Sequence, residues 1–399
     1  MKIKLYLGFL LATLLFTSCD HDTYELVDVY TPEYLSLDIF RATSVEISTP
    51  KNIEKSGKIY VYKNYVFVND FQKGIHIIEN SNPENPVKIG FIKVLGNADI
   101  EVKNNYLYAD SYMDLIVFDI SSIENIKIEA RLKNVFPRNF GLGYGYNENG
   151  IITGYKVTKE WRKTSDYDYY LTNDALNFNS EGGTGQGGSL ARFKIVNDYL
   201  YAVDQSSINV FDISNLNTPQ ELEDVYVNFG IETIFNRGNT LFLGSTNGMY
   251  IYDISSPASP DYVSELQHVT SCDPVVVDGD YAYVTLRGGN NCGATESSLE
   301  IIDISDLKNP TLKERYLMDN PYGLGVKDDF LFICDGTSGL KVYNKNNIEN
   351  LELLHTFKNI NAFDVIPTAN QLLMIGDSVL YQYTYSNNGI QLLSEFSLQ

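Results

Sequence analysis

Short runs of alternating apolar and polar residues, separated by polar turns, recur along most of the chain. One kind of run opens with an aromatic or apolar residue directly after a turn, as in NYVFVND from Asn64. The opening position recurs at Tyr65, Tyr106, Tyr199, Thr240, Tyr281, Phe330 and Gln371. Four of the six spacings between these positions are 41 residues. Period-two alternation predicts strands, and the constant spacing predicts a repeated unit.

A second landmark follows in most units, where an apolar run ends in an acidic residue, one further residue (usually Ile) and Ser. It occurs at Ile77–Ser81, Val117–Ser121, Val210–Ser214, Ile251–Ser255 and Ile301–Ser305. Seven residues after the acidic position comes a proline, at Pro86, Pro219, Pro260 and Pro310. Asp and Ser bond to nearby backbone and Pro fixes φ, so this is turn chemistry. The repeated Asp is therefore predicted to be structural rather than catalytic.

Each unit divides into four short strands. The first leads into a tight turn such as Val277-Asp278-Gly279-Asp280, the second is the aromatic run, the third ends in Asp-Ile-Ser, and the fourth follows the proline. Hairpins of this kind indicate antiparallel pairing, and no window shows sustained helical periodicity. Repeated four-strand units of about 40–45 residues are typical of propeller blades. We therefore predict an all-β fold, a β-propeller of four-stranded antiparallel blades.

The number of blades depends on residues 138–188. Asn139–Gly143 matches Pro321–Gly325 of a regular unit, and Gly150–Gly154 matches a second strand. We interpret 138–188 as a degenerate third blade with a long Gly/Asn-rich loop, which favours eight blades. Seven is the alternative, if the segment is only an excursion from the ring.

The third-strand motif, LIVFDIS at Leu115–Ser121, resembles the signature of the LVIVD-repeat family. The resemblance covers roughly residues 55–399 and implies a β-propeller of the kind found on bacterial and archaeal surfaces. It implies no particular activity.

The N-terminus resembles a bacterial lipoprotein signal. Lys2 and Lys4 precede an apolar run, Leu5–Phe16, that is too short to span a membrane. Thr17-Ser18-Cys19 follows, and the resemblance implies cleavage after residue 18 and lipidation, including palmitate, at Cys19. The acidic tract Asp20–Glu25 resembles the surface-export signal of Bacteroidetes lipoproteins. We expect a signal peptide at 1–18, a tether and lead-in at 19–55 and the propeller at 56–399, displayed on the outer membrane at the cell surface.

Charge restricts the possible partners. The chain carries a formal net charge of −21. Nucleic-acid binding needs a basic face, so this class is excluded, and adhesion to anionic lipid is disfavoured. We expect a monomer that touches the membrane only through its lipid.

Ionisable residues of both signs recur just before the aromatic runs, where the innermost strand of a blade begins. Because innermost strands start at one mouth of the channel, these groups are predicted to converge there. The predicted binding residues are Asp99, Arg138, Arg192, Glu232, Asp273, Arg287, Tyr322 and Asp364. The alternative is that they solvate the mouth and pair with one another.

Three cysteines remain besides Cys19. Cys272 precedes an innermost strand and Cys292 lies in the second-to-third-strand loop of the same blade, so we predict a disulfide between them in an oxidising compartment. Cys334 lies in a second strand and is expected to be buried.

No cofactor or metal is predicted. Gly183–Gly188 has the glycine spacing of a dinucleotide-binding motif. The motif also requires a helix after the glycines, and here a strand is predicted, so no dinucleotide site is expected. None of the four histidines lies at ligand spacing. Asp166–Asn177 offers oxygens of the kind that bind calcium but lacks the calcium-loop pattern, and a solvated acidic loop is favoured.

No catalytic constellation stands out in the sequence, although its absence does not decide the matter. We favour a surface lipoprotein whose propeller binds a protein or glycan partner without catalysis. One alternative is an enzyme acting on a glycan or anionic sugar at the channel mouth. Another is a structural subunit of an envelope complex.

Overall fold

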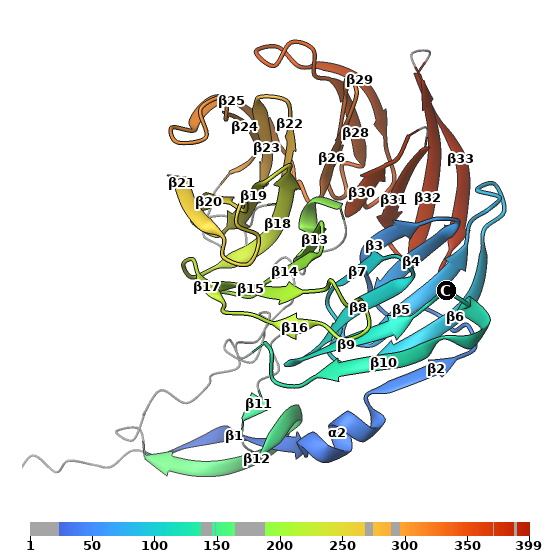
Figure 1. Cartoon of the computed structure of the whole chain (residues 1–399), viewed down its shortest axis with the longest axis vertical. Helices are drawn as coiled ribbons and strands as arrows, with labels where there is room; N and C mark the ends of the chain where they lie inside the picture. The colour runs from blue at the N-terminus through green and yellow to red at the C-terminus, as the bar shows by residue number, and fades with distance from the viewer. Residues whose placement is uncertain are drawn as a thin grey trace, which may run out of the picture.

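The computed structural model of the chain describes residues 24–136, 146–147, 149–163, 188–267, 274–288, 296–369, 371–386 and 389–399. Within this part, seven antiparallel sheets stand in a ring as the blades of a β-propeller (Figure 1). The predicted all-β propeller is confirmed, with the alternative count of seven blades in place of the favoured eight.

The blades follow one another along the chain, each with its strands in order from the inside of the ring outward. Blade 1 comprises β3 (Ser56–Tyr62), β4 (Tyr65–Asp70), β5 (Gly74–Glu79) and β6 (Val87–Val94), and β2 (Val45–Ser48) adds a fifth, outermost strand. Blade 2 comprises β7 (Ile100–Lys103), β8 (Tyr106–Ser111), β9 (Asp114–Asp119) and β10 (Lys127–Leu132). Blade 3 comprises β13 (Phe193–Val196), β14 (Tyr199–Val203), β15 (Ser207–Asp212) and an interrupted outer strand, β16 (Gln220–Glu221) and β17 (Val225–Tyr226).

The remaining blades are regular four-stranded sheets. Blade 4 comprises β18 (Ile231–Arg237), β19 (Thr240–Ser245), β20 (Gly248–Asp253) and β21 (Asp261–Gln267). Blade 5 comprises β22 (Val275–Asp278), β23 (Tyr281–Leu286), β24 (Ser297–Asp303) and β25 (Thr311–Met318). Blade 6 comprises β26 (Leu324–Lys327), β27 (Phe330–Cys334), β28 (Leu340–Asn344) and β29 (Glu352–Phe357). Blade 7 comprises β30 (Asp364–Pro367), β31 (Gln371–Gly376), β32 (Val379–Ser386) and β33 (Gly389–Ser397).

The ring closes although the first and last blades share no strand: each is built from its own consecutive strands. The innermost strands contact each other in sequence around the ring, and β30 of blade 7 contacts β3 of blade 1. The Asn80 and Gln382 side-chain amides pair across this junction at 2.8–3.0 Å. Lys88 Nζ donates to the last two carbonyl oxygens of the chain, each at 3.1 Å. A core shared by the two blades, which includes Ile59 and Leu373, joins the first blade to the last.

The repeated motifs perform the structural roles that their chemistry predicts. In four blades the motif aspartate accepts a hydrogen bond from the Ser N–H two residues later, at 2.8–2.9 Å. The tyrosine in the second strand reaches the next blade, since the Tyr108 hydroxyl donates to Leu216 O and the Tyr201 hydroxyl to Pro257 O, both at 2.8 Å. The motif turn of one blade is thus the docking point for the blade before it.

The described parts of residues 138–188 do not form the expected degenerate blade. Strands β11 (Tyr146–Asn147) and β12 (Gly150–Lys163) join β1 (Tyr24–Leu35) in a separate three-stranded sheet. A blade's second strand buries five successive residues, as β8 does, whereas β12 buries only Gly150 and Ile151. The sequence match of Gly150–Gly154 to a second strand therefore depended on the first few residues of β12 alone. The segment 19–55, expected as a tether, contains β1, helix α2 (Leu37–Thr43) and β2.

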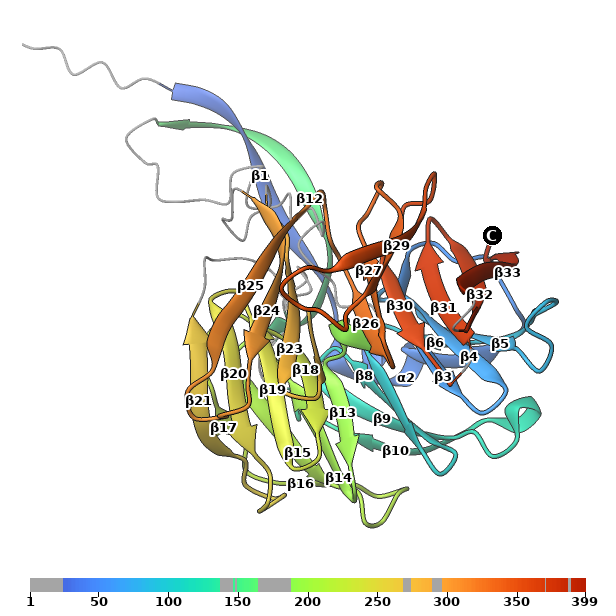
Figure 2. The same ribbon diagram turned by 90° about the horizontal axis from the view of Figure 1, so that it is seen from above.

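The long β1–β12 ribbon projects from the ring and is fastened at its base (Figures 1 and 2). Phe40 of α2 packs there with Met113 and Ile151. The buried Asp114 carboxylate accepts hydrogen bonds from Arg41 at 2.9 and 3.0 Å and from Arg131 at 3.0 Å. Within the described residues no helix has the length and apolar character needed to cross a bilayer.

Candidate functional site

All seven innermost strands begin on one side of the ring, which we call the mouth face. The loops between second and third strands and the connections between blades lie on the same side, because strand direction alternates within each blade. A short 3-10 helix, η4 (Gly188–Leu190), leads into blade 3 and lies against β3, β18, β22, β26 and β30. The buried Ser189 Oγ accepts a hydrogen bond from Leu324 N at 2.9 Å. The chain therefore lays its own segment across the innermost strands.

One structurally equivalent position in each blade lies seven residues before the second strand's opening residue. Taken around the ring, its occupants are Lys58, Asp99, Arg192, Thr233, Pro274, Gly323 and Asp364. In adjacent blades 7, 1, 2 and 3 acidic and basic residues alternate at this position. Sequence reasoning identified Asp99, Arg192 and Asp364 but missed Lys58, although the same count back from Tyr65 finds it.

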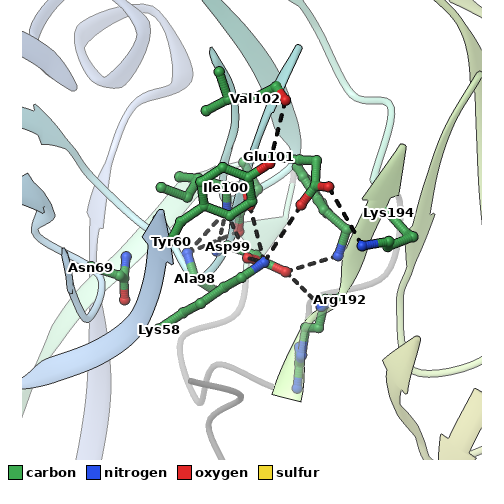
Figure 3. Close-up of polar contacts among 12 residues, drawn as sticks. Lys58, Tyr60, Asn69, Ala98, Asp99, Ile100, Glu101, Val102, Arg192 and Lys194 are labelled. Carbon is green, nitrogen blue, oxygen red and sulfur yellow. Dashed lines mark hydrogen bonds and ion pairs between the residues drawn. The ribbon is translucent and has the colours of Figure 1, made fainter. Parts of the chain in front are cut away.

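Asp99 joins three blades (Figure 3). Its carboxylate accepts hydrogen bonds from the backbone N–H groups of Arg192 at 2.5 Å and Phe193 at 2.8 Å, both in blade 3. It also forms an ion pair with Lys58 Nζ of blade 1. Both carboxylate oxygens are used within the protein, and the side chain is buried. The Asp99 carboxylate therefore links blade 2 to blades 1 and 3.

Glu101 extends this network on the same strand. Lys58 Nζ lies 3.9 Å from one of its carboxylate oxygens and Lys194 Nζ 3.9 Å from the other (Figure 3). Burial raises the pKa of Glu101, while the two ammonium groups act in the opposite direction. Lys58 Nζ also donates to Ile100 O at 3.0 Å. Glu101, Lys58 and Lys194 were not predicted as site residues.

Arg192 is buried in the same region. Burial lowers the pKa of its guanidinium, and the carboxylates of Glu232, Asp110 and Asp99 oppose that shift. Glu232 is half-buried in β18, the innermost strand of blade 4. Three of the predicted residues, Asp99, Arg192 and Glu232, thus interact electrostatically across blades 2, 3 and 4.

Asp364 begins the innermost strand of blade 7 and is fully buried. Burial raises the pKa of its carboxyl well above the usual value, against the opposing effects of the Val365 N–H and Lys58. A Cβ at Gly323 would lie 2.3 Å from Asp364 Oδ1, so the glycine makes room for this carboxyl group. A neutral, enclosed acid is what this environment favours.

Aromatic residues lie on the mouth face in two further places, among blades 5, 6 and 7 and between blades 3 and 4. The Arg287 guanidinium lies over the Tyr322 ring at 4.3 Å, and Tyr322 meets Phe363 edge-to-face at 5.2 Å. Tyr226 and Phe229, just before blade 4, form a second edge-to-face pair at 6.2 Å. These two rings are 55% and 67% exposed. Sequence reasoning named Arg287 and Tyr322 but missed the exposed pair.

Several predicted residues lie outside the described part of the chain: Arg138, Asp273, Cys19, Cys272, Cys292 and the Asp166–Asn177 loop. The predicted Cys272–Cys292 disulfide therefore stays a prediction. Cys334 is buried and free in β27, as expected. Among the described residues, no group of three or more His, Cys, Asp or Glu side chains is arranged to hold a metal ion.

Five stretches of the chain match the LVIVD repeat, at residues 55–93, 96–124, 187–227, 234–267 and 271–318. The chain belongs to the LVIVD-repeat family. The matches fall on blades 1 to 5, while blades 6 and 7 of this LVIVD-repeat protein share the blade fold without a match. At the motif turn of blade 6, Asn344 takes the place of the aspartate and accepts from Asn346 N at 2.9 Å.

Solved structures show the same fold. The designed protein Ika8 aligns with a TM-score of 0.53 at 11% identity, over 87% of this chain and 90% of its own. A functionally unknown protein from Desulfotomaculum acetoxidans aligns with a TM-score of 0.51 at 14% identity, over 86% and 99%. Kluyveromyces lactis Hsv2 aligns with a TM-score of 0.50 at 10% identity, over 88% and 100%. No curated protein sequence matches this chain. At these identities the likeness concerns the fold alone.

Proposed function

We propose that this LVIVD-repeat protein is a cell-surface lipoprotein whose mouth face binds a protein partner without catalysis. The observation that carries the proposal is the exposed Tyr226–Phe229 pair on that face. Large aromatic side chains are enriched at protein interfaces and supply much of their binding energy. The pair lies between blades 3 and 4, where the chain passes from β17 to β18.

The buried ion network supports a scaffold role for the channel mouth. An enzyme working there would use Asp99 or Arg192, yet Asp99 has its two oxygens engaged by backbone N–H groups and Lys58. The short helix η4 also lies against five of the innermost strands. Among the described residues of the mouth face, the exposed Tyr226–Phe229 pair is therefore better placed to meet a partner than the buried Asp99 and Arg192.

A photo-cross-linker at position 229 tests the proposed partner surface in the native cell. The matched control is position 312, since Leu312 is also exposed but begins β25 on the side opposite the mouth face. We expect one discrete adduct from 229 and none from 312, and loss of co-purification of that partner with Phe229→Ser. Equal labelling from both positions would refute a mouth-face partner. Binding of the purified protein to a glycan panel, lost with the same variant, would point to a glycan instead.

The anchor is tested separately. We expect the mass of the N-terminal peptide to show lipid on Cys19, and Cys19→Ala to release the protein from the membrane fraction. Protease treatment of intact cells should degrade the lipidated protein if it faces outward. Protection in intact cells would contradict surface display while leaving the lipid in place.

A further inference from the structure

The β1–β12 ribbon exposes an apolar surface that no other described segment covers. The two strands pair from Tyr24↔Lys163 at the free end to Leu35↔Ile151 at the base. Only the base packs on the propeller, through the cluster around Phe40 and Met113. The rest projects away from the ring (Figures 1 and 2).

Strand alternation sorts the large apolar side chains of the ribbon onto one side. Directly paired residues share a face, and residues two apart along a strand share it too. The pairs Leu26↔Trp161 and Tyr30↔Val157 therefore lie on the same face as Tyr24. Exposure reaches 68% for Trp161, 56% for Tyr24, 52% for Val157 and 49% for Leu26. Holding so much apolar surface in water is unfavourable, which indicates that something covers it.

The ribbon also differs from the rest of the chain in charge. Its four basic residues, Lys156, Lys159, Arg162 and Lys163, balance its four acidic residues, Glu25, Asp28, Glu33 and Glu160. The whole chain carries −21. The ribbon therefore approaches a phosphate-bearing surface without net repulsion, although the chain as a whole is acidic. Trp and Tyr together with Lys and Arg are the residue types that anchor proteins at membrane–water interfaces.

The free end of the ribbon is also where the chain leads toward its predicted anchor. Tyr24 lies five residues after Cys19, and five residues span at most about 17 Å. This inference rests on the proposed lipid anchor. We propose that the Tyr24, Leu26, Val157 and Trp161 face of the ribbon lies in the headgroup region of the membrane that holds the lipid.

This placement sets the orientation of the propeller. The ribbon leaves the ring on the side of the mouth face (Figure 2). The mouth face is then turned toward the membrane, and its partner is a protein held at or near that membrane.

Trp161 is the only tryptophan of the chain, so its fluorescence reports on the ribbon alone. The lipidated protein is incorporated into phosphatidylcholine–phosphatidylglycerol vesicles that carry brominated acyl chains. We expect a blue-shifted emission that is quenched more by bromine near the headgroup than by bromine near the chain end. Leu26→Asp should abolish most of the quenching. Val27→Asp, one residue along and on the opposite face, should preserve it.

The outcomes separate this inference from the anchor. Lipid on Cys19 with unquenched Trp161 overturns the ribbon inference and leaves the anchor standing. If Cys19 carries no lipid, the proposed anchor fails, and quenching of the unlipidated chain added to vesicles then supports or overturns the ribbon inference by itself. A blue shift that depends on protein concentration without vesicles would assign the face to a second copy of the chain and overturn the proposal.

Discussion

Asp99 in blade 2 accepts a hydrogen bond from the backbone N–H of Arg192 in blade 3, over 2.5 Å. The same carboxylate pairs with Lys58 in blade 1. One buried side chain thus ties together three blades that share no strand. Neighbouring blades also meet by side-chain packing, by the tyrosine hydroxyls that reach the next motif turn, and by other polar contacts such as the Asn80–Gln382 pair.

Replacing Asp99 by Asn should destabilise the propeller strongly. The amide has the same shape but removes the closer of the two carboxylates that face the buried Lys58 ammonium, and breaking a buried pair costs about 3–5 kcal/mol. Denaturant unfolding measures the change. Asp198→Asn is the matched control, because the Asp198–Lys103 pair is at the surface, and such pairs contribute about 1 kcal/mol or less. Equal losses for the two variants would contradict a fastening role for Asp99.

The base of the ribbon should loosen in acid. Burial acts to raise the pKa of Asp114, but hydrogen bonds from Arg41, the Asn134 N–H and Arg131 outweigh it and hold the pKa below its usual value. A depressed folded-state pKa contributes stability above the unfolded pKa of about 3.9, and that stability is lost as pH falls through the folded value.

The stability gap between the wild type and Asp114→Asn should therefore be full near neutral pH and close below about pH 3.9. Thermal melts across this range measure it. A gap that is the same at all pH values would mean that the charge of Asp114 is not what holds α2 to blade 2.

Tyr201→Phe should weaken the contact between blades 3 and 4. The variant keeps the ring and loses the hydroxyl that donates to Pro257 O at 2.8 Å. A net loss of about 1 kcal/mol is expected for one such bond. Tyr199→Phe on the same strand is the comparison. Tyr199 is only half-buried, so the loss of its hydroxyl is expected to cost less stability. Chemical denaturation midpoints for both variants decide the point, and a larger loss at 199 would run against the prediction.

Gly323→Ala should be poorly tolerated although its φ is not in the left-handed region. The added Cβ would lie 2.3 Å from Asp364 Oδ1 and 3.0 Å from both Asp364 Cα and Phe363 O. Overpacking of this kind costs about 1–3 kcal/mol. Gly154→Ala in the ribbon is the matched control, with its closest contact at 3.7 Å. A shift in melting temperature confined to the 323 variant would confirm the close packing of blades 6 and 7.

The blade could be predicted because its rules are local. Alternation, the tight turns and the Asp-Ile-Ser motif act within about forty residues, so the turn roles of Asp119 and Asp212 follow correctly from their neighbours in the chain. The alternative count of seven blades is confirmed, and the favoured count of eight was wrong because Gly150–Ile152 has the local pattern of a second strand. Its actual partner, β1, lies more than a hundred residues earlier in the chain. Local pattern does not identify such a partner.

The sequence by itself determined that the chain is a repeat of four-stranded units and that charged groups precede the innermost strands. Of the ion network it indicated Asp99, Arg192, Glu232 and Asp364, but not Lys58, Glu101 or Lys194. Only the tertiary structure decided that Asp99 faces Lys58 and Arg192 of neighbouring blades, that η4 crosses the mouth, and that Trp161 stands exposed on a ribbon. These relations depend on how separate units are placed around the axis. Burial and pairing of charges are set by that placement, because the cost of a charge depends on what surrounds it.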